Sequence, residues 1–333
     1  MQFPGIACIM TTYVEFARIN ELLLAQRESA KETKMTENRN GWIPEIIGDW
    51  WQIAGNPDLG KYQTDRQEPL DFGIWQAADG SWQLWSCVRY TGCGGKTRLF
   101  YRWEGQRLTD KDWLPMGIAM EADPNFGETE GGLQAPYVLK KGDVFYMYYG
   151  DWINICLAKS WDGKTFVRHL NADGLSGLFS EKPGTSSRDP MVMAYRNKYY
   201  IYYTGVLEGK GAIYCRTSSD LVNWGDSVVV SSGGIGGNGP ASAECAFVYY
   251  LPHDYAFYFF RAHPVKDSDE YATAVYRSKN PLDFGVDSDE YLIGSLPYEA
   301  VRIIKDGPDF YLTALNPKYD GIRLARMKWV PVK

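Results

Sequence analysis

Five segments of this chain follow one pattern, and this repeat constrains the fold more than any other feature. Each segment begins as a strand of alternating apolar residues, passes through a turn that carries Gly or Asn, and returns as an aromatic-rich strand. Such units are typical of β-hairpins. The hairpins open at Asp71, Ala135, Asp189, Glu244 and Glu299, at intervals of about 54 to 64 residues.

A third strand is expected after each hairpin, at 99–103, 156–160, 214–218, 274–278 and 323–327. Three of these strands run into a turn that starts with Ser160, Ser218 or Ser278 and carries Asp or Asn two residues later. Asp and Asn suit turns because their side chains bond the nearby backbone. We therefore interpret Asp162 and Asp220 as structural, and expect the aromatic residue that follows each turn to pack between repeats.

Five units with about four strands each predict an all-β, five-bladed β-propeller with antiparallel blades. A β-sandwich is the alternative, but it would not explain one period repeated five times. We expect residues 42–333 to form the propeller as the catalytic domain, with 42–55 as a strand that leads into the first blade. Residues 1–41 are predicted to be an N-terminal extension, partly helical because 14–34 carries a broad apolar face.

Composition excludes several classes of protein. The formal net charge is −6 and no basic block is present, so a nucleic-acid partner is not expected. No apolar run reaches the roughly 18 residues of a membrane span. The N-terminus shows no recognisable signal peptide, although we expect an extracellular or periplasmic location. The sequence leaves the oligomeric state open.

Cysteine and histidine usage argues against a metal centre built from these residues. The chain has six Cys and three His without any Cys-x-x-Cys pair. Neither a metal nor an organic cofactor is expected at the site, and a structural cation in the central channel stays an alternative. Cys87 and Cys93 are compatible with a local disulfide or with two free thiols.

Acidic residues open four of the five hairpins. In a propeller the first strand of each blade lines the central channel, so these side chains would meet at one mouth of it. Crowded carboxylates repel one another and lose hydration, which allows one to stay protonated while another is ionised. Cleavage of a glycosidic bond needs one protonated and one ionised carboxyl group. We select Asp71, Asp189 and Glu244 as catalytic candidates. Glu299 is a candidate substrate-binding residue that shapes a sugar subsite, with balancing a cation in the channel or forming an ion pair as the alternatives.

The ends of the second strands are expected to return to the same mouth. Trp152 is the candidate for stacking on a sugar face, and Asp151 and Arg261 for bonding sugar hydroxyls. Asn316 is the corresponding candidate in the last repeat. Arg89, Thr204 and His263 are expected at the same rim.

Three short motifs resemble known families. Ser187-Arg188-Asp189-Pro190 and Glu244-Cys245 resemble the Arg-Asp-Pro and Glu-Cys motifs of glycoside hydrolase family 32. Ala135-Pro136-Tyr137-Val138 resembles the Trp-Ala-Pro-Asp-Val motif of glycoside hydrolase family 43. The resemblance covers about 60–333 and extends to neighbouring families of the same superfamily. It implies a five-bladed propeller with an Asp, Asp, Glu triad on blades one, three and four.

Carried over to this chain, the resemblance implies that Glu244 is the general acid and Asp71 the general base or the nucleophile. Asp189 would orient the substrate and tune the acid, and Arg188 would hold a sugar hydroxyl or keep Asp189 ionised. The predicted function is a glycoside hydrolase acting on furanosidic or pentose-containing oligo- or polysaccharides. The alternatives are a non-catalytic carbohydrate-binding propeller, and a glycoside phosphorylase whose phosphate pocket would use Arg188 and Arg261.

Overall fold

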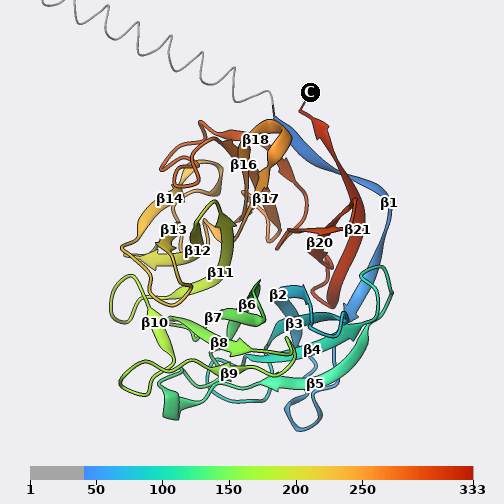
Figure 1. Ribbon diagram of the computed structural model, residues 1–333, viewed down its shortest axis with the longest axis vertical. Helices are drawn as coiled ribbons and strands as arrows, with labels where there is room; N and C mark the ends of the chain where they lie inside the picture. The colour runs from blue at the N-terminus through green and yellow to red at the C-terminus, as the bar shows by residue number, and fades with distance from the viewer. Residues whose placement is uncertain (1–40, 333) are drawn as a thin grey trace, which may run out of the picture.

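The computed structural model describes residues 41–332, and they form a five-bladed β-propeller (Figure 1). This confirms the predicted fold. The expected helix within 14–34 lies outside the described residues. The helices among residues 41–332 are all single 3₁₀ turns, at Gly60–Tyr62, Pro124–Phe126, Gly234–Gly236 and Pro252–Asp254. None of them is long or apolar enough to cross a membrane.

Blades one to four follow each other along the chain, and the first strand of each lies innermost. Blade one consists of β2 (Glu68–Gln76), β3 (Trp82–Arg89), β4 (Leu99–Gly105) and β5 (Leu114–Met120). Blade two consists of β6 (Gln134–Lys141), β7 (Val144–Gly150) and β8 (Ile155–Ser160), whose outer edge pairs with β9 (Val167–Arg168) and β10 (Gly177–Phe179).

The next two blades repeat this order with four strands each. Blade three consists of β11 (Ser187–Tyr195), β12 (Lys198–Leu207), β13 (Lys210–Ser218) and β14 (Val228–Ser232). Blade four consists of β15 (Glu244–Leu251), β16 (Ala256–Pro264), β17 (Tyr271–Ser278) and β18 (Leu292–Leu296). The five third strands predicted from the sequence are all present.

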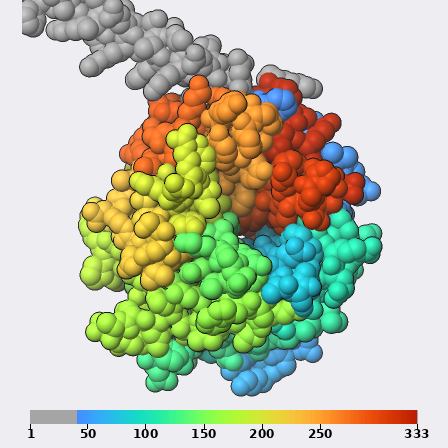
Figure 2. Space-filling model, viewed as in Figure 1, coloured from blue at the N-terminus to red at the C-terminus, as the bar shows by residue number. Residues whose placement is uncertain are grey.

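Blade five joins the two ends of the described chain. Its inner strands are β19 (Arg302–Asp306), β20 (Asp309–Leu315) and β21 (Gly321–Pro331), and its outer strand is β1 (Trp42–Gly55). The expectation that 42–55 leads into the first blade is therefore wrong. The strand pairs antiparallel with β21, from Trp42 opposite Pro331 to Gly55 opposite Gly321. This pairing covers the edge of β21 and closes the ring (Figures 1 and 2).

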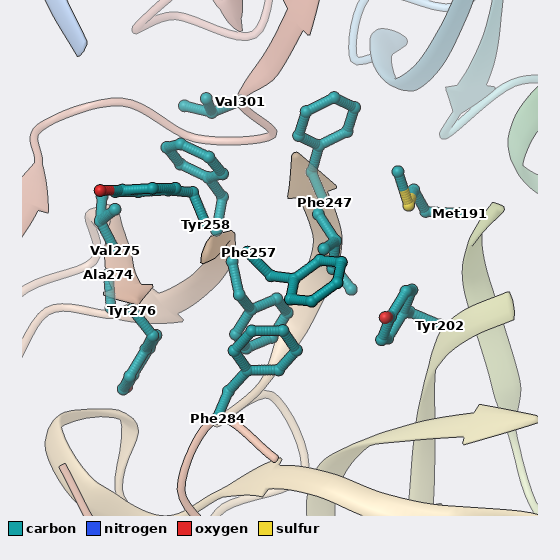
Figure 3. Packing of buried hydrophobic residues seen from close by; sticks show 14 of the residues in the cluster. Met191, Tyr202, Phe247, Phe257, Tyr258, Ala274, Val275, Tyr276, Phe284 and Val301 are labelled. Atoms are coloured by element: carbon teal, nitrogen blue, oxygen red, sulfur yellow. The ribbon is translucent and has the colours of Figure 1, made fainter. Parts of the chain in front are cut away.

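Aromatic side chains fill the space between blades. The largest buried cluster joins blades three, four and five, and includes Met191, Tyr202, Phe247 and Phe284 (Figure 3). Phe284 stacks on Phe259 with ring centroids 4.6 Å apart and lies 6.3 Å from Tyr202 of the preceding blade. Burial of such rings is the main stabilising contribution to the ring of blades.

The three Ser-x-Asp and Ser-x-Asn turns have the predicted structural role. In blade two the Asp162 carboxylate accepts hydrogen bonds from the Ser160 hydroxyl and from the backbone amides of Lys164 and Thr165. The following Phe166 lies edge-on to Trp85 of blade one, 5.3 Å between centroids. Each turn therefore directs an aromatic side chain onto the preceding blade.

Candidate functional site

Each inner strand begins with one residue in the left-handed backbone region. These residues are Asp71, Ala135, Asp189, Cys245 and Ala300, with φ between 41° and 55°. In blades one to four the strand pairing shifts register at the same point. The structurally equivalent positions in blades four and five are thus Cys245 and Ala300. Glu244 and Glu299 lie one residue earlier, which corrects the register taken from the sequence.

The kink brings consecutive side chains to one side of the strand. In a regular strand they would point to opposite faces, but a bulge breaks this alternation. Arg188 and Asp189 of blade three therefore line the same cavity, as do Glu244 and Cys245 of blade four.

This cavity, the carboxylate pocket, has a volume of about 110 Å³. It receives side chains from all five blades, and its wall is formed by Leu70, Asp71, Arg89, Arg98, Gln134, Arg188, Asp189, Glu244, Cys245, Tyr271, Glu299 and Tyr319. The structure thus brings together the three catalytic candidates, Arg188 and Glu299. A larger cavity of about 550 Å³ lies along the inner strands, but its described lining contains no Asp or Glu.

Asp71 and Asp189 lie together in the buried part of the pocket. One oxygen of each carboxylate and the Cys245 sulfur are all within 4.8 Å of one another. The Cys245 thiol donates to Asp71 Oδ1 over 3.5 Å. Asp189 Oδ2 accepts from the Thr204 hydroxyl at 3.0 Å and from the Cys245 amide at 3.3 Å.

Among the described residues, Asp71, Asp189 and Cys245 lie close enough together to hold a cation. Burial, together with the charges of Asp189 and Asp71, raises the pKa of the Cys245 thiol well above its usual value. Without a bound cation, the protonated thiol is a hydrogen-bond donor to Asp71. The arrangement is therefore best described as two carboxyl groups joined through Cys245.

The neighbours of Asp71 act on its pKa in opposite directions. Burial and the neighbouring Asp189 carboxylate raise its pKa, whereas the Arg98 guanidinium, 3.9 Å away, and the Cys245 thiol lower it. Burial is the largest of these effects, so the pKa of Asp71 is higher than that of an exposed Asp.

Glu244 lies at the edge of the pocket, where its side chain is 20% exposed. Its carboxylate is in direct contact with Arg188 Nη2, and Arg188 Nε is also 3.8 Å from Asp189 Oδ2. Burial raises the pKa of Glu244, and the Asp189 and Asp71 charges act in the same direction. Arg188 opposes the rise, so this arginine controls the protonation of Glu244.

Glu299 is the fourth acid of the pocket. Its carboxylate accepts a hydrogen bond of 2.7 Å from the Tyr319 hydroxyl. Burial, with a further contribution from the Asp71 and Glu244 charges, raises the pKa of Glu299 to about 7. This carboxyl group is partly protonated at neutral pH.

Two of the predicted substrate-binding residues lie outside the pocket wall. The Asp151 carboxylate is buried and accepts from the backbone amides of Ile153 and Asn154, so it stabilises its own turn. Arg261 is fully buried and donates to the Ser231 hydroxyl and the Gly233 carbonyl. Both side chains stabilise the local chain, and neither is part of the described pocket wall.

Trp152 and Asn316 lie close to the pocket without lining it. The Trp152 ring has the Arg98 guanidinium 5.2 Å from its centroid, so it covers an arginine that does line the pocket. Asn316 lines a neighbouring cavity. Arg89 lines the pocket as expected, and Thr204 contacts it through Asp189, whereas His263 is buried elsewhere.

Sequence reasoning missed Arg98, Gln134, Cys245, Tyr271 and Tyr319. Arg98 ends the loop before β4, and Tyr319 lies in the loop between β20 and β21. The loops at this point differ in length from repeat to repeat, so the sequence repeat does not predict these two residues. Gln134 and Cys245 lie at or directly before a kink, where two consecutive side chains reach the pocket, and the sequence carries no local mark of these kinks. The disulfide considered for Cys87 and Cys93 is not formed, and both are free thiols.

Several solved structures of glycoside hydrolases share this architecture. A thermostable family-43 glycoside hydrolase is 19% identical, with a TM-score of 0.56 over 80% of this chain and 90% of that one. An endo-arabinase from Bacteroides thetaiotaomicron is 15% identical, with a TM-score of 0.59 over 80% of this chain and 94% of that one. A family-32 β-fructofuranosidase from Bombyx mori is 16% identical, with a TM-score of 0.57 over 94% and 70%.

The fold is therefore the five-bladed propeller found in glycoside hydrolases of families 43 and 32, as the sequence motifs indicated. No protein-family model matches the sequence. No curated protein matches it at the sequence level either.

Proposed function

We propose that this protein is a glycoside hydrolase that cleaves furanosidic or pentose-containing glycans. Glu244 acts as the general acid, Asp71 as the general base or nucleophile, and Asp189 orients the substrate and tunes the acid. An oligo- or polysaccharide is the substrate. The fold shared with an arabinase and a fructofuranosidase supports this substrate class.

One observation carries the proposal: carboxyl groups from blades one, three and four converge on a single small cavity. Burying several acids together is unfavourable, and a purely structural wall would avoid it. A pocket that raises the pKa of two carboxyl groups can keep one protonated as the acid near neutral pH. Glycoside hydrolysis uses such a pair.

The positions of the three acids favour Glu244 as the general acid and Asp71 as the general base or nucleophile. Glu244 at the pocket edge can reach the oxygen of a leaving group that points to solvent. Asp71 is more deeply placed, with its side chain 12% exposed, and Arg98 and the Cys245 thiol partly offset the rise in its pKa that burial and Asp189 cause. Asp189 accepts hydrogen bonds from the Thr204 hydroxyl and the Cys245 amide. These bonds hold its carboxylate in place, as a group that orients sugar hydroxyls requires.

A glycoside phosphorylase is the second candidate, because three arginines line the pocket. Each of them already has an acidic neighbour, however. Arg188 pairs with Glu244, Arg89 Nε lies 2.6 Å from Glu68, and Arg98 lies near Asp71. Four acids also outnumber the three arginines, which disfavours a bound phosphate.

The proposal is tested by assaying the wild type, Glu244→Gln and Asp71→Asn on aryl arabinofuranosides, xylosides and fructosides, with and without inorganic phosphate. We expect wild-type hydrolysis without phosphate. The loss should be at least about 100-fold in Asp71→Asn on all of these substrates, and in Glu244→Gln on those with poor leaving groups, which need a proton. A strict requirement for phosphate would favour the phosphorylase. Sugar binding without turnover would favour a carbohydrate-binding propeller.

A further inference from the structure

A second cavity adjoins the carboxylate pocket between blades four and five. This side groove has a volume of about 290 Å³ and shares Tyr271, Glu299 and Tyr319 with the carboxylate pocket. Because the Glu299 carboxylate and the Tyr319 hydroxyl are hydrogen-bonded to each other, they form a common wall. A ligand extending from one cavity into the other would pass these two side chains.

The remainder of the groove offers flat apolar surfaces and an amide. The rings of Tyr271 and Tyr298 are half-buried, and Pro297 and Pro317 flank them. Asn316 Nδ2 is held by Gln52 and Asp320 at 3.1 and 3.0 Å, and no described donor reaches its Oδ1. Aromatic faces suit the C–H face of a sugar ring, and amides and hydroxyls suit its OH groups.

Arg323 supplies an unused donor to this groove. Its guanidinium lies 4.5 Å from the Trp50 ring centroid and 5.4 Å from that of Tyr298. Its Nε is buried and has no hydrogen-bond partner among residues 41–332. Because the guanidinium as a whole has no hydrogen-bond or ion-pair partner in that range, a sugar oxygen in the groove would supply it with an acceptor.

The charges of the groove select against acidic sugars. Asp269, Glu270 and Glu299 line it together with a single cation, Arg323. A uronate or a sulfated unit would be repelled by this excess of acids. An uncharged pentose or hexose unit carries only hydroxyl and ether oxygens and avoids the repulsion.

We infer that the side groove is a second saccharide subsite, which holds an uncharged sugar unit next to the one at Asp71 and Glu244. This inference rests on the proposed function. It predicts that substrates long enough to fill both cavities are used better than substrates with one sugar.

The test compares an aryl monoglycoside with neutral arabino-, xylo- and fructo-oligosaccharides of two to five units. In the wild type, the unit that fills the groove is expected to raise kcat/KM about tenfold. Asn316→Trp fills the groove and should abolish this gain. The matched control is Lys318→Trp, two residues further in the same turn, which is exposed and outside the groove wall and should keep it.

Arg323→Met provides a second variant in case the bulky tryptophan disturbs folding, and it should reduce the gain at least threefold. An unchanged length dependence in both variants would overturn the inference. The same oligosaccharides are titrated calorimetrically into Asp71→Asn protein, so that binding to the groove is measured even if no glycoside is hydrolysed. Tighter binding of oligogalacturonate than of the neutral series would also overturn it.

Discussion

At the scale of single residues, the site depends on side chains that lie at or directly before a backbone kink. Asp71 and Asp189 adopt φ values of 41° and 55°, a region that Asp and Asn tolerate better than most residues. Glu244 precedes its kink and reaches the same pocket from the neighbouring position. The chain thereby places acids from three blades close enough to alter one another's pKa values.

Arg188 is expected to set the upper pH limit of activity. Its charge lowers the pKa of Glu244, so Arg188→Met should raise that pKa. Because the acid must be protonated, the alkaline limb of the kcat/KM profile should move to higher pH. The profile of Arg188→Lys, which keeps the charge, serves as the control and should shift less. An alkaline limb that stays in place in Arg188→Met would contradict this role.

Glu299 is expected to reduce stability at neutral and alkaline pH. Its pKa rises from 4.5 to about 7 on folding, mainly through burial. An acid whose pKa is higher in the folded state makes stability fall as pH rises between these two values. Glu299→Gln should therefore raise Tm by about 2–4 °C at pH 8 and give no gain at pH 4.

The control for this measurement is Glu208→Gln, at a position whose side chain is 85% exposed. It should leave Tm unchanged at both pH values. Equal Tm values for wild type and Glu299→Gln at pH 8 would show that Glu299 carries no burial cost.

At the scale of elements, the strands and turns could be predicted from the sequence. The register at the beginning of the inner strands could not. Alternation of apolar residues and the turn motifs identified the hairpins, because these signals are local. A one-residue bulge leaves no local mark, so Glu244 and Cys245 could not be assigned to their two positions. Arg261 follows the strand pattern of the rim, yet its guanidinium is used inside the fold by Ser231 and Gly233.

The Ser-x-Asp turns are expected to matter for stability and not for turnover. Asp162→Ala removes the acceptor of three hydrogen bonds and should cost about 1 kcal/mol of unfolding free energy. Asp162→Asn keeps an acceptor oxygen, as Asn280 does in the matching turn of blade four. Denaturant unfolding should rank wild type and Asp162→Asn together, above Asp162→Ala, with equal kcat/KM for all three. A loss of activity would mean that the turn contributes to the site.

At the scale of the whole molecule, the ring is closed by strands from opposite ends of the described chain. Sequence periodicity indicated the number of blades, because each repeat carries the same pattern. It did not indicate that 42–55 completes blade five, since β1 follows no hairpin and its partner β21 lies about 280 residues away. Closure of this kind is a long-range contact that no local pattern encodes.

The closing strand is expected to be essential for folding stability. Ile53 of β1 is fully buried in the cluster that joins blades five and one. Ile53→Ala should cost about 2–5 kcal/mol, measured by urea unfolding. Ile47 of the same strand is 48% exposed, and Ile47→Ala should change stability by less than about 0.5 kcal/mol. Similar effects of the two substitutions would mean that packing of β1 against the hydrophobic core does not stabilise the fold.

The central claim is that Glu244 and Asp71 act as acid and base or nucleophile in one pocket. The most direct measurement is the hydrolysis of a series of aryl glycosides whose leaving groups differ in pKa, by the wild type, Glu244→Ala and Asp71→Ala. We predict that Glu244→Ala retains activity on the best leaving groups and loses it progressively on poorer ones, because only these need a proton. Asp71→Ala should be impaired on all of them. Wild-type rates across the series in both variants would show that neither Glu244 nor Asp71 takes part in the reaction.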